Sequence, residues 1–290
     1  PMTAPPLSTP PRPTPPADDA AARASIRAYA EQVIRGDTLA DKLRPPPELV
    51  ELGDRELPLI FHAPGRPREL PIVPGRAGRV PPIVGMRDRG QRIRILHALA
   101  NHELQAVELF AWALLAFPQA PEAFRRGLVA ILADEQRHLG LYLDRLRAHG
   151  AAFGDHPVTG HFWNKLEHYR TPLRFCCAMG LTFENANLDF ALEYAQAARA
   201  AGDPATAEVL QTVHDEEISH VRFGWVWMRK LGGQEEPWQT YVSHLEWPLS
   251  PSRARGKTFA AEARRRAGID EDFIAKLEAA PALQPSGARR

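Results

Sequence analysis

Four stretches of the chain carry apolar residues every three or four positions, the period of an α-helix. These stretches are residues 92–117, 122–149, 171–201 and 203–231. Pro118 and Pro121 interrupt the pattern after the first stretch, and Gly202 with Pro204 separates the last two. The pattern predicts an all-α fold: four helices of about 25–30 residues, paired by short loops into a four-helix bundle. About 20 residues join the second and third helices, which permits a crossover connection.

The segment before the predicted bundle is rich in proline. Eighteen of the 28 prolines lie in the first 90 residues. Eight of them fall within residues 1–16, which predicts a disordered leader. A helix is expected from Asp18 or Asp19 to the residue before Gly36. Further prolines between residues 44 and 80 exclude a helix there and, with the apolar residues among them, indicate an arm wrapped over a core.

The predicted organisation therefore has four parts: a leader over residues 1–16, an N-terminal helix and extended arm packed on the bundle over 17–90, the bundle over 91–232, and a C-terminal extension over 233–290. One or two short helices are expected between residues 256 and 280, with Asp270 as an N-cap.

Composition and charge argue against several classes of protein. The formal net charge is +1, so bulk charge does not hold this chain to nucleic acid. The longest apolar run, near residues 109–117, is about half of a ~20-residue membrane span, and no secretory signal is evident. The two cysteines, Cys176 and Cys177, are neighbours and cannot staple distant segments. We therefore expect a cytoplasmic protein with no membrane partner.

The second and fourth helices share one acidic motif. Glu135 and His138 on the second helix, and Glu217 and His220 on the fourth, form two Glu-x-x-His pairs, each directly preceded by another acid. Residues three apart on a helix lie on one face, one turn from each other. Each pair can therefore present a carboxylate and an imidazole to the same point.

Spacing indicates that the bundle is a duplicated helix pair. Glu103 precedes Glu135 by 32 residues, and Glu184 precedes Glu217 by 33. Glu103 and Glu184 both lie in the apolar centres of their helices. The alternative ligand Glu108 would give a spacing of 27, so it is interpreted as a surface acid or an acid beside the ligands.

Such a bundle turns four carboxylates and two imidazoles inward. Burying the carboxylates without countercharge would cost many kcal/mol, and two divalent metals would neutralise them. This ligand set is typical of di-iron and di-manganese bundles. The sequence predicts a di-metal centre with the following ligands: Glu103, Glu135, His138, Glu184, Glu217 and His220.

Several segments resemble the ferritin-like superfamily, and more closely a bacterial ferritin-like family of unknown function related to tRNA-hydroxylating di-iron enzymes. The resemblance lies in these segments: PGRPRELPIV (64–73), LHALANHELQAVEL (96–109), DEQRH (134–138), LTFENANLD (181–189), EEISHVRFG (216–224) and ARRRAGID (263–270). One departure is Asn185-Ala186, where close relatives are expected to have Ala-Arg. The resemblance implies a ferritin-like four-helix bundle that holds two iron ions; manganese or mixed Mn/Fe would fit the same ligands.

By this resemblance the protein is expected to be a di-iron oxidoreductase that activates O2 as a hydroxylase or oxygenase. Electrons would come from a separate reductase, since no flavin or nicotinamide fingerprint is present. The substrate stays open between a small molecule and a tRNA-like anion, and a homodimer is compatible with the sequence. Two alternatives are iron handling or peroxide detoxification, and a metal-stabilised interaction protein without catalysis.

Four further residues lie near the predicted ligands. Tyr142 falls on the metal-facing stripe of the second helix, as a functional tyrosine or a core residue, and His214 on the Glu217 face, as an extra ligand, a second-shell donor or a partly exposed residue. Asn187 could hydrogen-bond a ligand. Gly224, the counterpart of Tyr142, would either leave a hollow beside the metals or allow close helix contact.

Other polar residues receive structural interpretations. His97 and His102 fall off the Glu103 face and are expected to be structural or exposed, and the cysteines to be buried. Residues 251–290 carry nine basic and five acidic side chains, a net charge of +4. The basic residues of this segment are either a solvated helix face or a contact for an anionic substrate, including tRNA; they include Arg253, Arg255, Lys257 and the run Arg264–Arg266.

Overall fold

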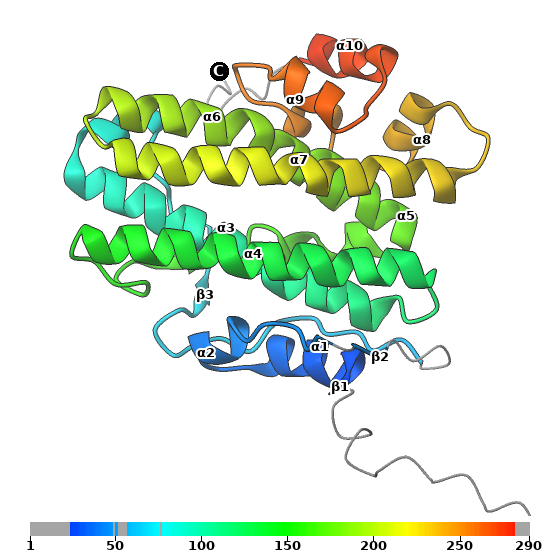
Figure 1. Cartoon of the computed structure of the whole chain (residues 1–290), viewed down its shortest axis with the longest axis horizontal. Coiled ribbons are helices and arrows are strands. Elements are labelled where there is room, and N and C mark those ends of the chain that lie inside the picture. The colour runs from blue at the N-terminus through cyan, green and yellow to red at the C-terminus, as the bar shows by residue number, and fades with distance from the viewer. Residues whose placement is uncertain (1–23, 49, 52–56, 76, 282–290) are drawn as a thin grey trace, which may run out of the picture.

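The computed structural model describes residues 24–48, 50–51, 57–75 and 77–281. Long helices packed side by side dominate it, in agreement with the predicted all-α fold (Figure 1). Helix α3 (Arg89–Ala116) pairs with α4 (Glu122–Ala148), and α6 (Asn185–Ala200) pairs with α7 (Pro204–Gly232). None of the described helices is long and apolar enough to cross a membrane.

Side-chain caps fix where three of the bundle helices begin. Asp88 accepts a hydrogen bond from the Gln91 amide at the start of α3, and Asp203 accepts one from Thr206 at the start of α7. Thr171 caps α5 (Pro172–Phe175), which has proline at its first position as expected. These starts lie within three residues of the predicted ones.

The third long helix differs from the prediction in its winding. After α5 it continues as a π-helical segment, η4 (Cys176–Glu184), before it becomes the α-helix α6. The Thr182 hydroxyl donates to the Cys177 carbonyl five residues earlier, at 2.8 Å. The apolar pattern predicted a helix here, but it does not distinguish an α-helical turn from a wider one.

The connection between α4 and α5 is a crossover. Figure 1 shows α4 ending and α5 beginning at opposite ends of the bundle, so the intervening chain runs back along its length. It contains strand β4 (Val158–Thr159), which pairs in parallel with β3 (Ile72–Val73), and the 3-10 helix η3 (Trp163–Tyr169).

The N-terminal segments pack against α3. Helix α1 (Ile26–Arg35) contacts α3 through an apolar face. The short elements around it are β1 (Ala24–Ser25), α2 (Leu39–Lys42) and β2 (Val50–Glu51), which pairs in parallel with β1. The 3-10 helix η2 (Ile83–Arg87) contacts α3 and α6. The predicted leader and the expected helix start at Asp18 or Asp19 lie outside the described residues, within which α1 begins at Ile26.

The C-terminal segment adds short helices over the second helix pair. These are α8 (Pro237–Ser243), the 3-10 helix η5 (Pro251–Ala254), α9 (Ala261–Arg266) and α10 (Glu271–Ala279). Asp270 caps α10 by accepting from the Phe273 amide, as predicted. Helix α8 was not anticipated.

Candidate metal centre

The six predicted ligands meet at the middle of the bundle. Each of the four long helices contributes, because the apolar stripe that builds the core also carries these polar residues inward. All six side chains are at most 5% exposed. The duplication inferred from spacing thus brings residues 117 positions apart, Glu103 and His220, into one cluster.

The cluster divides into two groups whose ligand atoms lie within 4.8 Å of one another. One group contains Glu103, Glu135, His138 and Glu217; the other contains Glu135, Glu184, Glu217 and His220. Glu135 and Glu217 belong to both groups, which is where carboxylates that bridge two metal ions would lie. The buried Glu and His side chains could therefore hold metal.

Unsatisfied buried atoms test whether a metal fits. The Nδ1 atom of His138 and Oε2 of Glu135 lie 3.8 Å apart, and neither has a hydrogen-bond partner among the described residues. Buried polar atoms in native proteins are nearly always paired. Two divalent cations would satisfy these atoms, so the donor set fits the metals that the sequence predicts.

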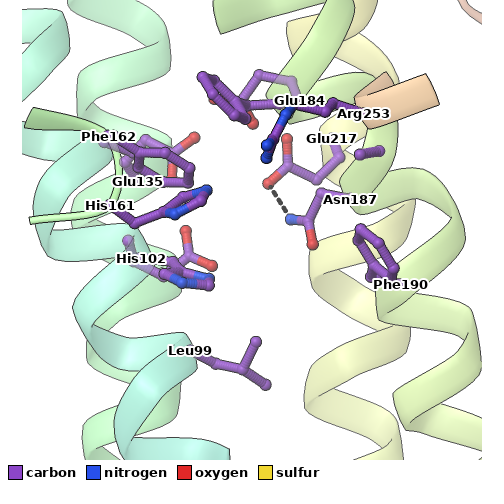
Figure 2. Close-up of a pocket in the computed structure, with 14 residues that line it drawn as sticks. Leu99, His102, Glu135, His161, Phe162, Glu184, Asn187, Phe190, Glu217 and Arg253 are labelled. Atoms are coloured by element: carbon purple, nitrogen blue, oxygen red, sulfur yellow. Dashed lines mark hydrogen bonds between the residues drawn. The ribbon is translucent and has the colours of Figure 1, made fainter. Parts of the chain in front are cut away.

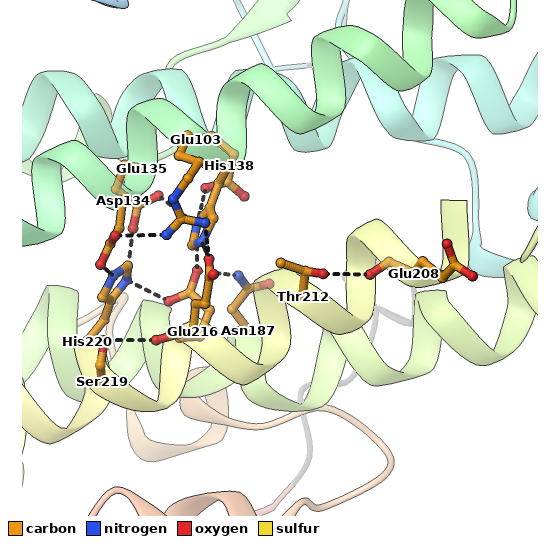
Figure 3. A network of polar contacts seen from close by, with 12 residues as sticks. Glu103, Asp134, Glu135, His138, Asn187, Glu208, Thr212, Glu216, Ser219 and His220 are labelled. Atoms are coloured by element: carbon orange, nitrogen blue, oxygen red, sulfur yellow. Dashed lines mark hydrogen bonds and ion pairs between the residues drawn. The ribbon is translucent and has the colours of Figure 1, made fainter. Parts of the chain in front are cut away.

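The outer nitrogen of each histidine binds an acid on the opposite half of the bundle. Nε2 of His138 lies 2.7 Å from Oε2 of Glu216, and Nε2 of His220 lies 3.3 Å from Oδ2 of Asp134 (Figure 3). The inner Nδ1 atoms face the carboxylates; that of His220 is 3.0 Å from both Glu135 and Glu217. Carboxylates in this outer position orient a metal-bound imidazole and raise its basicity.

Arg137 connects the two outer acids. Its guanidinium donates to Oδ1 of Asp134 at 2.8 Å and to Oε2 of Glu216 at 2.5 Å. The corresponding position on α7 is Ser219, whose hydroxyl donates to its own helix. The outer network is therefore bridged by a single cation at the surface of the centre.

The pKa values of several side chains in the cluster are raised, as expected where buried carboxylates lie together. Burial and the neighbouring carboxylates raise the pKa of Glu103 and of Glu184 well above the usual range. Burial alone would lower the pKa of His138, but Glu135 and Glu216 raise it to about 9; facing acids likewise raise the pKa of His220 despite burial. These shifts favour protonated forms in the cluster, which reduces the repulsion among its carboxylates.

A cavity of about 280 Å³ adjoins the ligands. Its wall includes Glu103, Glu135, Glu184 and Glu217, and most of the rest is apolar. Figure 2 shows His102 and His161 on one side of this space and Asn187 and Glu217 on the other. The cavity is mostly lined by residues of α3 and of the third long helix.

The cavity therefore does not lie beside Gly224, as one reading of the sequence suggested. A Cβ at Gly224 would lie 2.9 Å from the Cα of Gly180, so glycine permits α7 and the π-helical segment to touch through their backbones. The alternative reading, close helix contact, is confirmed. This contact lies four residues beyond His220 and four before Glu184.

The other residues singled out near the centre have structural partners. Asn187 donates to Oε1 of Glu217 at 3.0 Å, so it does hydrogen-bond a candidate ligand. His214 is buried, with Nδ1 2.9 Å from the Leu188 carbonyl, and belongs to neither metal group. Tyr142 is buried in the core, where burial and the nearby charge of Glu103 raise its pKa.

Glu108 is not a surface acid. It is fully buried, with Oε1 3.2 Å from Nζ of Lys42 and Oε2 2.8 Å from Arg66, and it also accepts from the Trp163 indole. Buried carboxylates persist when they are paired and hydrogen-bonded. Glu108 thus binds the N-terminal segments to α3.

Asp189 lies five residues beyond Glu184, as Glu108 lies five beyond Glu103, and it plays the same part for the C-terminal segment. Arg264 binds both carboxylate oxygens of Asp189, at 2.8 and 3.0 Å, and both side chains are fully buried. Both sequence interpretations of Arg264 are therefore wrong, whereas Arg265 is exposed and pairs with Glu271. The sequence carried no signal for these partners, since they come from segments outside the duplication.

Four other residues singled out in the sequence lie in the interior or at the cavity. His97 is structural: its Nε2 accepts from the Gly154 amide at 2.9 Å, and burial lowers its pKa to about 4. Cys176 and Cys177 are free and buried as predicted. His102, expected to be structural or exposed, instead lines the cavity.

A comparison with protein families gives one match, to a family described as "Protein of unknown function (DUF455)", over residues 18–275. The chain belongs to this family. Comparisons with curated proteins and with solved structures gave no match. The DUF455 match includes all six candidate ligands together with the buried pairs of Glu108 and Asp189.

Proposed function

We propose that this DUF455 protein is a ferritin-like di-iron carboxylate oxidoreductase that activates O2 and hydroxylates or oxygenates an organic substrate. The observation that supports this most strongly is the position of the cavity. Four carboxylates of the candidate metal centre form part of its wall, and side chains such as Phe162 and Phe183 form another part. An apolar space beside a metal centre suits the binding of an organic substrate.

The donor set favours iron. Carboxylates are hard ligands, imidazole suits iron as well, and the six side chains would leave coordination positions open on two metals. When bound, a di-iron centre supplies the reductive activation of O2. Manganese or a mixed Mn/Fe pair would fit the same ligands.

The residues of the chain hold the centre and control its surroundings. Glu135 and Glu217, which belong to both groups, would hold metal together with the other four candidate ligands, while Glu216 and Asp134 hold the two imidazoles with Nδ1 inward. Asn187 donates to Glu217 and fixes that carboxylate at the cavity wall. Burial of all six ligands excludes bulk water, which protects reactive intermediates from side reactions.

Electrons would come from a separate reductase. Arg137 and the outer acids lie at the partly exposed side of the cluster, 34–45% exposed. The opposite side of the cluster faces the cavity. We therefore place electron delivery on the Arg137 side and substrate on the cavity side.

O2 consumption tests the proposal. Protein loaded with Fe(II) without oxygen, chemically reduced and then exposed to O2, should consume O2, and Glu217→Ala should not. Glu208→Ala, exposed on the same helix, is the matched control. A reduced, metal-loaded protein that consumes no O2 would favour the interaction protein. Rapid turnover of peroxide, or a many-subunit cage on a sizing column, would favour the iron-handling alternative.

A further inference from the structure

Cationic and imidazole side chains line the same cavity as the candidate metal ligands. Arg253 of η5 and His161 line the cavity. Lys165 lies behind them: its ammonium donates to the His161 carbonyl and sits 5.7 Å from the centre of the Phe183 ring. Each of these residues comes from a segment outside the two Glu-x-x-His helices.

Lys165 and Arg253 each donate to a backbone carbonyl. Arg253 uses its Nε to donate to the Pro248 carbonyl at 2.6 Å, and within the described residues neither Arg253 nor Lys165 forms an ion pair. Burial, followed by repulsion from the like charge of Arg253, lowers the pKa of Lys165 to about 8. A bound anion would relieve this repulsion and would pair with the guanidinium.

Beside these cations, the candidate metal ligands, His102 and Asn187, the wall has an apolar part. It is formed by Leu99, Ala106, Phe162, Phe183, Ala186 and Phe190. Phe190 is 38% exposed, so the cavity reaches the surface there. A volume of about 280 Å³ lies near the lower end of the ~300–1,000 Å³ that ligand pockets span.

We propose that the cavity binds a small organic acid, with its carboxylate or phosphate on Arg253 and an aromatic or alkyl body against the phenylalanines. The inference rests on the proposed function for its chemistry: the apolar body would be the part presented to the metal centre. With two divalent cations and four carboxylates, the filled centre is neutral, so Arg253 supplies the charge that selects an anion.

Three probes that each carry a phenyl group on a short alkyl chain, but differ in the charge of the head group, separate the effect of charge from that of shape. They are 4-phenylbutyrate, 2-phenylethyl phosphate and the neutral 4-phenylbutan-1-ol, each titrated calorimetrically into the metal-loaded full-length protein. At least one of the two acids should bind at least tenfold more tightly than the alcohol, and the tighter acid identifies the head group. Arg253→Gln should weaken the acid at least tenfold and leave the alcohol unchanged, while Arg253→Lys should restore part of the loss.

Arg126→Gln is the matched control, because Arg126 is exposed on α4 and pairs with Glu122. Equal binding of acid and alcohol would overturn the inference, as would an Arg253→Gln variant that binds the acid like the wild type. RNA of about 20 nucleotides that binds through Arg253 while the acids do not bind would overturn it in favour of a nucleic-acid substrate.

Repeating the titration on metal-free protein separates this inference from the proposed function. Acid binding that depends on Arg253 in both forms supports the inference even if the loaded protein consumes no O2. Acid binding that requires metal and ignores Arg253 means that the probe ligates the metal directly, which overturns the inference but leaves the metal centre intact.

Discussion

His138 on α4 is held by Glu216 on α7, with 2.7 Å between Nε2 and Oε2, and Glu216 directly precedes the candidate ligand Glu217. The reciprocal pair is His220 with Asp134, which directly precedes Glu135. The acid before each Glu-x-x-His motif therefore orients the histidine of the other motif. The two halves of the bundle hold each other's ligands in place.

Glu216→Gln should lower metal affinity by about 10–100-fold, the usual effect of removing such an outer partner. The neutral amide accepts a hydrogen bond less strongly, so it holds the imidazole of His138 less well. Competition against a metal-binding dye measures the affinity. Glu208→Gln is exposed on the same helix and should leave affinity unchanged. Equal loss in both variants would contradict the role of Glu216.

Glu108→Gln should reduce the free energy of unfolding by about 3–5 kcal/mol, because Lys42 and Arg66 would keep buried charges without their carboxylate. Urea denaturation measures this loss. The exposed pair Glu122–Arg126 provides the control, since Glu122→Gln should cost at most about 1 kcal/mol. A Glu108 variant as stable as the Glu122 variant would show that this buried ion pair does not hold the N-terminal segments.

Gly224→Ala should destabilise the protein by about 1–3 kcal/mol. The added methyl group would meet the backbone at Gly180, and neither backbone segment can move away without disturbing its helix. Gly140→Ala is the matched control: it lies within α4 with open space around it and should stabilise by about 0.5–1 kcal/mol. Thermal denaturation compares them. Equal effects from the two substitutions would contradict the close contact.

Loading metal should release protons at neutral pH, because ligands must lose their protons to bind metal. The pKa of His138 is raised to about 9, so this imidazole is protonated at neutral pH in the metal-free protein, and the pKa values of Glu103, Glu184 and His220 are raised in the same direction. Metal must displace those protons, so affinity falls as pH falls and rises toward the pKa of His138, about 9. Titration in weakly buffered solution measures the release, and affinity that is constant between about pH 6 and 8 would contradict it.

The cluster of six candidate ligands was predictable because its sequence signal is local and repeated. Glu135 and His138 share a helix face by spacing alone, and the intervals of 32 and 33 residues selected Glu103 and Glu184 as their partners. The apolar period likewise located the four long helices. Each of these inferences needs only helix geometry and a polar residue in an apolar setting.

What the sequence did not disclose depends on contacts between distant segments. The pairing of Arg264 with Asp189 joins residues 75 apart, and no periodicity relates them. The π-helical winding before Glu184 has no compositional signature. Arg253 and His161 reach the cavity from a short 3-10 helix and a loop, where spacing carries no directional information.

Metal content of the protein purified without chelator tests the central claim most directly. The wild-type protein and Glu108→Ala should each hold about two metal ions per chain by elemental analysis, and Glu217→Ala, which removes a carboxylate shared by both groups, should hold far less than one. A wild-type chain that binds no metal and gains no stability when metal is added, or a Glu217→Ala variant that keeps two ions, would contradict the account.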